Sequence, residues 1–382
     1  MYLTANYETF SKRFAIAAKT TASGGLNPVF GQVLLSANAD DNTASLTATD
    51  TERVIKLNIP SVGVTDGGKV LLPTVLFTKI LGANPKAEHI EIGVEADVLN
   101  VYIGESKYKI PTMVSESFPD FDAEPGQDAI TLASTQLIDA LNLTTWAVDM
   151  DNSKYALAGV LFEPGTDASA KPVFNLVATD GRRLSVVHDQ TESAIPDDAD
   201  KAGNRIVPGK TLALARSIAQ LSGEEVSISG QYGEILFVFP DIALKSRLIE
   251  GRFPNWKKIM PSTLDRHKWV FATSDLLAAV KAASVVTTAL SPGIRLDFYT
   301  DGVKIMADAE GTGESTTSVK AEEAPDKVCK AKLDPAFVIQ YLSALDKDGQ
   351  VAVYVSEDKE KSVLFSQPVY AGKSTYVLMP LS

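Results

Sequence analysis

The sequence is poor in the residues that build metal sites and disulfides. It has one cysteine, Cys329, and three histidines among 382 residues. A single cysteine excludes a disulfide framework and any cysteine-based zinc site. The histidines His89, His188 and His267 lie far apart and match no metal-ligand spacing. We therefore expect neither a metal nor another cofactor.

Long apolar segments are also missing. No run reaches the roughly 18 apolar residues that a transmembrane helix requires, and the N-terminal segment is too polar for a signal peptide. These features predict a protein of the reducing cytoplasm. They count against one alternative, a surface-binding β-rich protein, because that class needs a secretion signal.

Motifs of catalysis are absent too. The sequence contains no G-x-x-x-x-G-K-[ST], G-x-G-x-x-G or G-x-S-x-G pattern. Segment 149–153 resembles the start of a calcium loop, but Lys154 and Val160 stand where Gly and Glu are needed. Cys329 fits an inert buried thiol better than a nucleophile. We expect a protein that is not an enzyme. The alternative, a hydrolase on an α+β scaffold, requires a clustered acid, base or metal set that the sequence does not reveal.

The charge balance limits how this chain can bind nucleic acid. Lys and Arg total 36 and Asp and Glu total 48, so the formal net charge is −12. Overall basicity therefore cannot drive DNA binding, and no base-reading module is recognisable. A hydrophobic content of 45% and a charged content of 22% indicate a globular chain, and its length predicts two or three domains.

A weak internal repeat recurs about every 127 residues. Its copies are 43–60, 173–189 and, more loosely, 293–310, and each is typical of two strands joined by a turn that contains Thr-Asp. Apolar periodicity predicts two helices for each copy. These helices are 7–19, 72–84, 135–148, 207–221, 274–289 and 333–345. In the first of them Phe10, Phe14 and Ala17 share one face, with Lys12 roughly opposite.

Two linkers with a Phe-Pro pair, 115–126 and 249–261, separate the copies. We therefore expect three similar α+β domains in tandem, at residues 1–124, 125–253 and 254–382. Two other segments are distinctive. Ala-Thr-Asp-Gly-Arg-Arg-Leu at 178–184 is either a hairpin turn with two solvated arginines or part of a site. The apolar C-terminus, 376–382, either forms a last edge strand or lines a pocket.

Taken together, these segments resemble the bacterial β sliding clamps, the processivity subunits of DNA polymerase III, whether cellular or phage-encoded. The resemblance covers the whole chain and rests on ATDGRRL, FPDFD, FPNWKKIMP, GIRL and YVLMP in this order. It implies that two chains form a closed head-to-tail ring, with helices lining the pore and sheets outside. Double-stranded DNA would be encircled without sequence-specific contacts. The replicative DNA polymerase, the clamp loader and other clamp-binding proteins would dock in a hydrophobic cleft.

The resemblance also implies roles for individual positions. The partner-peptide cleft would be formed by Leu157, Thr179, Gly181, Arg182, Arg183, Leu184, Pro254, Lys258, Ile259, Val377, Leu378, Met379 and Pro380. The side chains facing DNA would be Lys12, Arg13, Lys79, Lys154, Tyr155, Lys210, Arg216 and Lys281. The dimer interface would contain Tyr108, Ile110, Val286 and Thr287.

Overall fold

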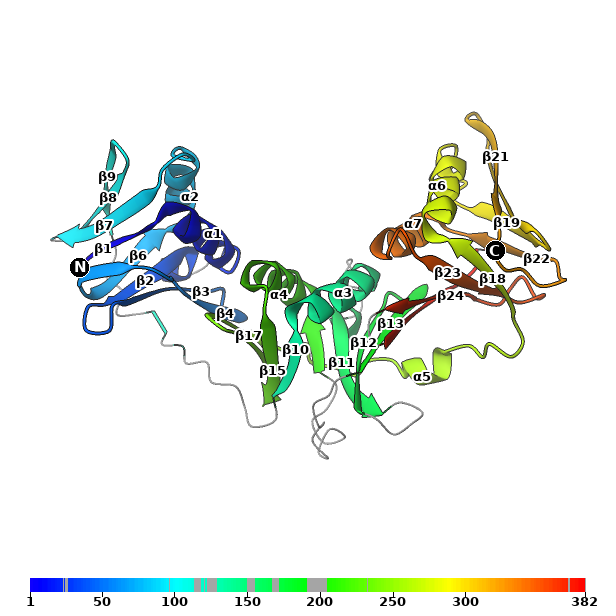
Figure 1. Ribbon diagram of the computed structural model, residues 1–382, viewed down its shortest axis with the longest axis horizontal. Helices are drawn as coiled ribbons and strands as arrows, with labels where there is room; N and C mark the ends of the chain where they lie inside the picture. The colour runs from blue at the N-terminus through cyan, green and yellow to red at the C-terminus, as the bar shows by residue number, and fades with distance from the viewer. Residues whose placement is uncertain are drawn as a thin grey trace. The chain divides into compact units, whose positions relative to one another are not determined.

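The chain folds into two compact units. The computed structural model describes residues 1–22, 24, 27–95, 97–112, 118–119, 121, 129–149, 155–166, 172–190, 205–231, 233–369 and 372–381. Unit 1 contains residues 1–138 and 210–248, and unit 2 contains residues 139–209 and 249–382. Both are built from antiparallel sheets with helices packed against them, which confirms the predicted α+β class (Figure 1).

Unit 1 contains two sheets. The first has the order β5-β1-β7-β8-β9 and consists of β1 (Tyr2–Asn6), β5 (Gly63–Asp66), β7 (His89–Glu95), β8 (Val98–Ile103) and β9 (Ser106–Pro111). The second has the order β10-β15-β16-β17-β4-β3-β2-β6 and consists of β2 (Gln32–Asn38), β3 (Thr43–Thr49), β4 (Arg53–Asn58), β6 (Gly68–Pro73), β10 (Ile130–Ala133), β15 (Glu225–Gln231), β16 (Glu234–Phe239) and β17 (Ile242–Arg247).

Unit 2 repeats this plan. Its larger sheet has the order β14-β11-β12-β13-β25-β24-β23-β18 and consists of β11 (Gly159–Thr166), β12 (Pro172–Thr179), β13 (Arg183–Gln190), β14 (Arg205–Pro208), β18 (His267–Ala272), β23 (Gln350–Val355), β24 (Val363–Val369) and β25 (Gly372–Leu378). The smaller sheet has the order β21-β20-β19-β22 and consists of β19 (Ile294–Tyr299), β20 (Gly302–Ala309), β21 (Gly313–Lys320) and β22 (Cys329–Leu333).

All six predicted helices are confirmed. They are α1 (Tyr7–Ala18), α2 (Thr74–Gly82), α3 (Ser134–Thr144), α4 (Gly209–Ser222), α6 (Thr273–Ser284) and α7 (Pro335–Ala344). A short further helix, α5 (Trp256–Ile259), lies in the predicted linker 249–261. Helix α1 lies beside α2, and α6 lies beside α7 (Figure 1).

Aromatic side chains hold the helices in place. Phe10 and Phe14 of α1 are buried against Phe77 of α2, with 5.0 Å between the ring centroids of Phe14 and Phe77. In unit 2, Tyr341 of α7 stacks on Tyr376 of β25 with centroids 4.7 Å apart. Burial of this pair raises the pKa of both hydroxyls, so both tyrosines stay neutral at physiological pH.

The internal repeat reappears as two closely similar turns, at 49–53 and 179–183, whose positions differ by 130 residues. In each, the threonine hydroxyl donates to the arginine carbonyl, at 2.7 Å in the first turn and 2.5 Å in the second. The aspartate accepts hydrogen bonds from the arginine backbone and side chain. Each arginine then reaches a residue 157 positions later: Arg53 donates to the Lys210 carbonyl, and Arg183 donates to the Gln340 side chain.

The third copy of the repeat was predicted in the wrong register. Segment 293–310 does form a hairpin, β19–β20, but the sheet order makes it equivalent to β2–β3. The equivalent turn is 309–313, which joins β20 to β21. A positive φ marks the third residue of every such turn, at +76° for Thr51, +89° for Gly181 and +78° for Gly311. The Thr-Asp pair at 300–301 therefore belongs to a different turn.

The apolar C-terminus is not an edge strand. β25 lies between β13 and β24, and it pairs with both over most of its length. Burial on two sides explains why Tyr376, Val377 and Leu378 are all apolar, because a central strand covered on both faces does not alternate with polar residues.

Candidate functional site

The turn 179–183 is rigid because its side chains satisfy its own backbone. Gly181 N–H donates to the Thr179 hydroxyl at 3.0 Å, and Asp180 Oδ1 accepts from the N–H groups of Arg182 and Arg183 at 2.9 and 3.1 Å. The positive φ of Gly181 favours glycine at this position. The Arg182 side chain is left exposed, whereas Thr179 is buried.

Arg183, which the resemblance places in the wall of the partner-peptide cleft, is held by contacts within its own chain. It is 7% exposed. Its Nε donates to Asp180 Oδ2 at 2.9 Å, Nη2 donates to the Trp146 carbonyl at 2.7 Å, and Nη1 donates to Gln340. The guanidinium also lies 4.1 Å from the centroid of the Phe337 ring. Every side of this cation is therefore occupied by its own chain.

An apolar cluster lies behind this turn. Leu157, Leu184 and Val377 are each buried to 4% exposure or less, and they pack in one cluster with Phe253 and Trp256. The structure thus brings together three of the predicted cleft residues from distant parts of the sequence. Trp256 of α5 was not predicted, and its indole N–H donates to Glu163 at 3.2 Å. An aromatic residue in the Phe-Pro linker was the signal that could have identified it.

Exposed apolar side chains border this cluster. Ile259, at the end of α5, is 54% exposed, and Met379 is 48% exposed. Pro254 is half-buried and Lys258 is exposed. Leu378 is 1% exposed, and adjacent residues of a strand point to opposite faces. Leu378 therefore points away from the face that Val377 occupies.

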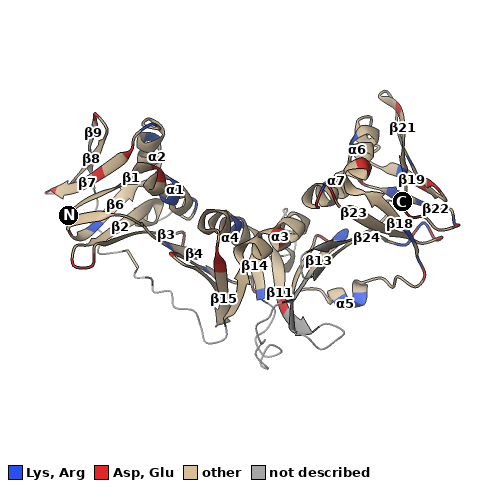
Figure 2. Ribbon diagram, viewed as in Figure 1, with Lys and Arg blue, Asp and Glu red and all other residues tan. Residues whose placement is uncertain are grey.

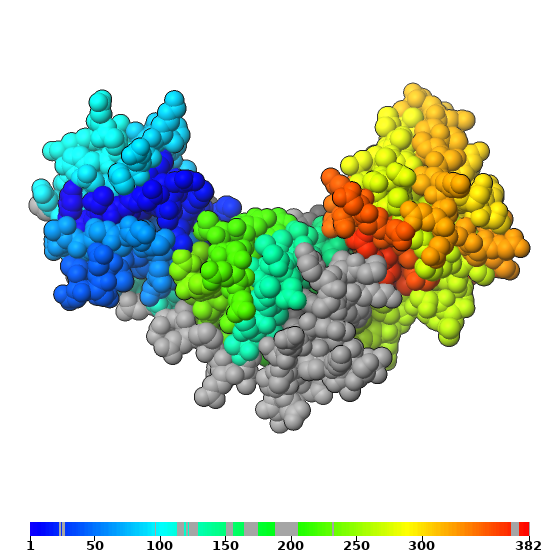
Figure 3. Space-filling model, in the orientation of Figure 1, coloured from blue at the N-terminus to red at the C-terminus, as the bar shows by residue number. Residues whose placement is uncertain are grey.

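Backbone hydrogen bonds fix the last residues of the chain. Met379 N–H donates to the Arg182 carbonyl at 3.0 Å, and Leu381 N–H donates to the Lys332 carbonyl at 2.8 Å. The space-filling view shows the C-terminal segment, drawn red, at the surface of unit 2 among the other residues of the last third (Figure 3). Met379 and Pro380 are therefore held beside the turn 179–183.

The predicted DNA-facing side chains occupy different environments. Lys12, Lys79, Lys210 and Lys281 are exposed on α1, α2, α4 and α6. Figure 2 shows basic segments, in blue, on these helices. Lys12 also forms an ion pair with Glu8 at 2.6 Å, which lowers the pKa of that carboxyl. Arg216 is half-buried. Lys154 and the side chain of Tyr155 lie outside the described residues.

Arg13 lies in a different environment from the four lysines. Its side chain is buried and pairs with Asp241, while Nε and Nη1 have no hydrogen-bond partner. The sequence pattern missed this because Lys12 and Arg13 are adjacent basic residues, and only one of two neighbours on an amphipathic helix can face the solvent fully.

The residues predicted for a dimer interface also differ from one another. Ile110 of β9 is 5% exposed and therefore belongs to the core of unit 1. The Tyr108 hydroxyl accepts a hydrogen bond from Asn84 at 3.0 Å. After α6, Val286 is half-buried, and the Thr287 hydroxyl donates to the Ser284 carbonyl at 2.8 Å. The exposed apolar residues here are Val285, at 77%, and Leu290, at 99%.

The described residues also bear on metal binding and on thiol reactivity. Within them, no group of three or more His, Cys, Asp or Glu side chains is arranged to hold a metal ion. Cys329 is buried, and burial raises the pKa of its thiol, which keeps it in the unreactive protonated form. Among the described helices, none has the length and apolar character needed to cross a membrane.

Comparison with known proteins identifies the family. The model for the N-terminal domain of the DNA polymerase III beta subunit matches residues 1–122, and the model for its central domain matches residues 131–255. Together these matches cover more than half of the chain. The chain belongs to the DNA polymerase III beta subunit family. Members of this family are the bacterial sliding clamps, so the predicted resemblance is confirmed and the hydrolase alternative is not supported.

Relatives in this sliding clamp family match along more than nine tenths of their length. The beta sliding clamp of Synechococcus elongatus is 26% identical over 386 residues, which covers all of this chain and 99% of the relative. That of Caulobacter vibrioides is 27% identical over 368 residues, covering 93% and 92% of the two chains.

Solved sliding clamp structures share the fold. The clamp from Bartonella birtlesii superposes with a TM-score of 0.87 at 20% identity, covering all of this chain and 99% of the other. A clamp from Pseudomonas aeruginosa gives 0.85 at 24% identity, with the same coverage.

Proposed function

We propose that two copies of this chain form a closed ring that encircles double-stranded DNA and tethers the replicative polymerase, without catalysing a reaction. Family membership supports this function, and the internal symmetry of the sheets supports the ring. The proposed ring keeps the three-domain division at 1–124, 125–253 and 254–382, and it would operate in the cytoplasm.

Strand pairing is the observation that supports the proposed ring most directly. The third strand after α1 is β4, and it pairs with β17, the third strand after α4. In the same way β13, the third strand after α3, pairs with β25, the third strand after α7. The remaining third strands are β9, after α2, and β21, after α6, and each lies at the edge of its sheet. Edge strands offer unpaired backbone groups to another chain. Because β9 and β21 differ, their pairing between copies is head to tail, and two such contacts close the ring.

Charge and apolar exposure favour this pairing. β9 carries Lys107 and Lys109, both exposed, and β21 carries the exposed Glu314 near its start and the exposed Lys320 at its end. Opposite charges on paired strands stabilise their contact. Helix α6 packs against β21 and ends beside the exposed Val285. Apolar surface at this end of α6 would be buried when the two edges meet.

Assembly can be tested at these apolar side chains. Changing Val285 and Leu290 together to Asp is expected to convert a dimer into a folded monomer, because both side chains are exposed in the single chain and the fold does not depend on burying them. Sedimentation gives the mass, and circular dichroism reports the fold. Leu264→Asp is the matched control, since Leu264 is 97% exposed in a loop before β18. A double variant that stays dimeric would refute this interface.

Retention of DNA would be topological. The chain has a net charge of −12, so phosphate contacts by a few exposed lysines on α1, α2, α4 and α6 cannot supply strong binding to free DNA. In the proposed ring these helices line the pore, where Lys12, Lys79, Lys210 and Lys281 weakly centre the duplex. Weak contacts allow sliding, while closure prevents escape.

The test compares circular with linear DNA. Protein loaded on nicked circular DNA by a clamp loader is expected to remain bound at about 0.5 M salt, where phosphate contacts are largely lost. Cutting the circle should release it from the ends. The variant with Lys12, Lys210 and Lys281 changed to Ala is expected to load less efficiently and to keep this difference. Equal release from circular and linear DNA at moderate salt would disprove a topological hold.

The apolar cluster beside the turn 179–183 is the proposed docking site for partners. Leu157, Leu184 and Val377 would form its floor, and Ile259 and Met379 would contact the apolar anchors of a short peptide. Anchors of this kind supply most of the affinity of a short peptide. The replicative polymerase, the clamp loader and repair proteins are the proposed partners.

A further inference from the structure

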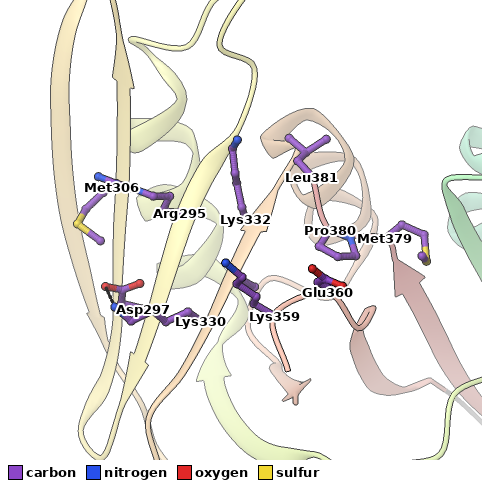
Figure 4. Close-up of a pocket in the computed structure, with 11 residues that line it drawn as sticks. Arg295, Asp297, Met306, Lys330, Lys332, Lys359, Glu360, Met379, Pro380 and Leu381 are labelled. Carbon is purple, nitrogen blue, oxygen red and sulfur yellow. Dashed lines mark ion pairs between the residues drawn. The ribbon is translucent and has the colours of Figure 1, made fainter. Parts of the chain in front are cut away.

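Cations in the pocket beside the C-terminal residues are paired within the chain. The pocket has a volume of about 820 Å³. Lys330 of β22 lies directly opposite Asp297 of β19 in the strand register, and the two side chains form an ion pair at 3.6 Å (Figure 4). Arg295 pairs with Asp308, also at 3.6 Å. The charge of these two cations therefore gives no reason to infer a ligand.

Two apolar side chains in the first turn of α2 are exposed, Val75 at 72% and Leu76 at 44%. Single exposed apolar side chains are common at protein surfaces, so their exposure alone does not identify an interface. Their place in the internal repeat is more informative, because Arg183 covers the equivalent turn of α7.

In unit 2 the turn 179–183 contacts α7 through stacked side chains. The guanidinium of Arg183 lies 4.1 Å from the ring centroid of Phe337 in α7 and 5.0 Å from that of Trp146, which follows α3. Nη2 of Arg183 also donates to the Trp146 carbonyl at 2.7 Å. Trp146, Arg183 and Phe337 therefore form a three-residue contact beside the paired strands β13 and β25.

Strand register identifies the residue of α2 that is equivalent to Phe337. The sheet order β6-β2-β3-β4 corresponds to the order β22-β19-β20-β21. Leu72 of β6 pairs with Val33, and Leu333 of β22 pairs with the equivalent Ile294. Counted from these two leucines, Leu76 occupies the position of Phe337.

The same comparison identifies the equivalent of Trp146. The sheet order β10-β15-β16-β17 corresponds to β18-β23-β24-β25. Ala133 and Ala272 end β10 and β18, and each pairs with the first residue of the next strand in its sheet. Counted from these two alanines, Val285 occupies the position of Trp146.

The three equivalent positions therefore lack a cation. Gly313 begins β21 as Arg183 begins β13, and the other two positions hold Leu76 and Val285, which is 77% exposed. Without a guanidinium between them, two apolar side chains at these positions can touch directly.

We infer that Leu76 of one copy packs directly against Val285 of the other copy. This inference rests on the proposed head-to-tail pairing of β9 with β21. Asn84, which closely follows α2, donates to the Tyr108 hydroxyl of β9 at 3.0 Å, so α2 ends beside β9. Helix α6 packs against β21. Pairing of the two strand edges therefore brings the exposed apolar ends of α2 and α6 together and removes their apolar surface from water.

Opposite charges at the two positions test direct contact. Leu76→Glu and Val285→Lys each place a charge against an apolar side chain, and each is expected to raise the dissociation constant of the dimer about tenfold. The double variant forms an ion pair, so its dissociation constant is expected to lie about tenfold below the product of the two single effects. This coupling should shrink at high salt. Sedimentation velocity over a dilution series measures the constant, and circular dichroism reports the fold.

Thr78→Glu combined with Val285→Lys serves as the comparison. Thr78 is exposed on α2, but side chains two positions apart on a helix do not share a face. The effects of these two changes are therefore expected to multiply without coupling.

The outcomes separate this contact from the ring. An unaltered protein that sediments as a monomer at every concentration contradicts the proposed ring itself. A dimer in which the effects of Leu76→Glu and Val285→Lys multiply without coupling overturns the contact alone. Coupling of equal strength in the Thr78 comparison also overturns it, because the charges would then act at long range.

Discussion

Arg183→Ala is expected to lower the melting temperature of unit 2 by about 10 °C. The change removes three side-chain hydrogen-bond contacts, to Asp180, Gln340 and the Trp146 carbonyl, and the stacking on Phe337. Loss of a buried, fully bonded cation costs about 3–5 kcal/mol, and for a unit of this size each kcal/mol lowers the melting temperature by about 2–4 °C. Thermal unfolding followed by circular dichroism measures this change.

The neighbouring arginine is the matched control. Arg182 belongs to the same turn but is exposed, so Arg182→Ala is expected to change stability by less than about 0.5 kcal/mol. Arg183→Lys should recover little, because an ammonium group cannot reproduce the planar fork that reaches several acceptors at once. Equal melting temperatures for the Arg182 and Arg183 variants would show that the buried network does not stabilise unit 2.

Asp241→Ala is expected to destabilise unit 1 by about 3 kcal/mol. Asp241 is the counter-ion of Arg13, whose side chain is 9% exposed. Removing the carboxylate leaves a buried guanidinium whose Nε and Nη1 already lack partners, and an uncompensated buried charge is strongly destabilising. Thermal unfolding should show a decrease of about 6–12 °C.

A second variant isolates the cause. Arg13→Met combined with Asp241→Ala removes both charges, and it is expected to regain most of the lost stability because an apolar pair can replace a buried ion pair at little cost. Glu234→Ala breaks the exposed Glu234–Lys245 pair of the same hairpin and should cost less than about 1 kcal/mol. A double variant as unstable as Asp241→Ala would mean that packing, rather than charge, is responsible.

Local patterns in the sequence predicted the helices and strands of this fold well. They predicted the environments of individual side chains less well. The period of apolar residues located all six long helices, because helix formation and the burial of one face depend on near neighbours. The apolar period does not indicate which side chains are buried against segments that are distant in the sequence. The sequence did not indicate that Arg13 pairs with Asp241, 228 residues later, or that Ile110 is buried within its own unit.

In the candidate site, too, local structure was predictable from the sequence and long-range contacts were not. The Thr-Asp-Gly-Arg-Arg segment indicated a tight turn, since its hydrogen bonds lie within the segment. Which of its arginines is buried depends on Trp146, Phe337 and Gln340, which no local pattern connects to it. The third copy of the repeat was misplaced for a related reason. A Thr-Asp pair is typical of many turns, and only the sheet order distinguishes the turn 309–313 from the one before it.

The missing arginine at that third turn gives the proposed ring unequal joints. Arg53 and Arg183 each cross from their turn to the helix of the next domain. The position equivalent to both is Gly313, with a φ of +118° that an arginine could adopt only under strain. In the proposed ring each chain therefore contains two bridged joints, while both joints between chains lack such a bridge and depend on strand pairing, surface charge and apolar packing. A loading partner could open either joint between chains without leaving a buried arginine unpaired. The same strand edges could pair again once DNA is inside the ring.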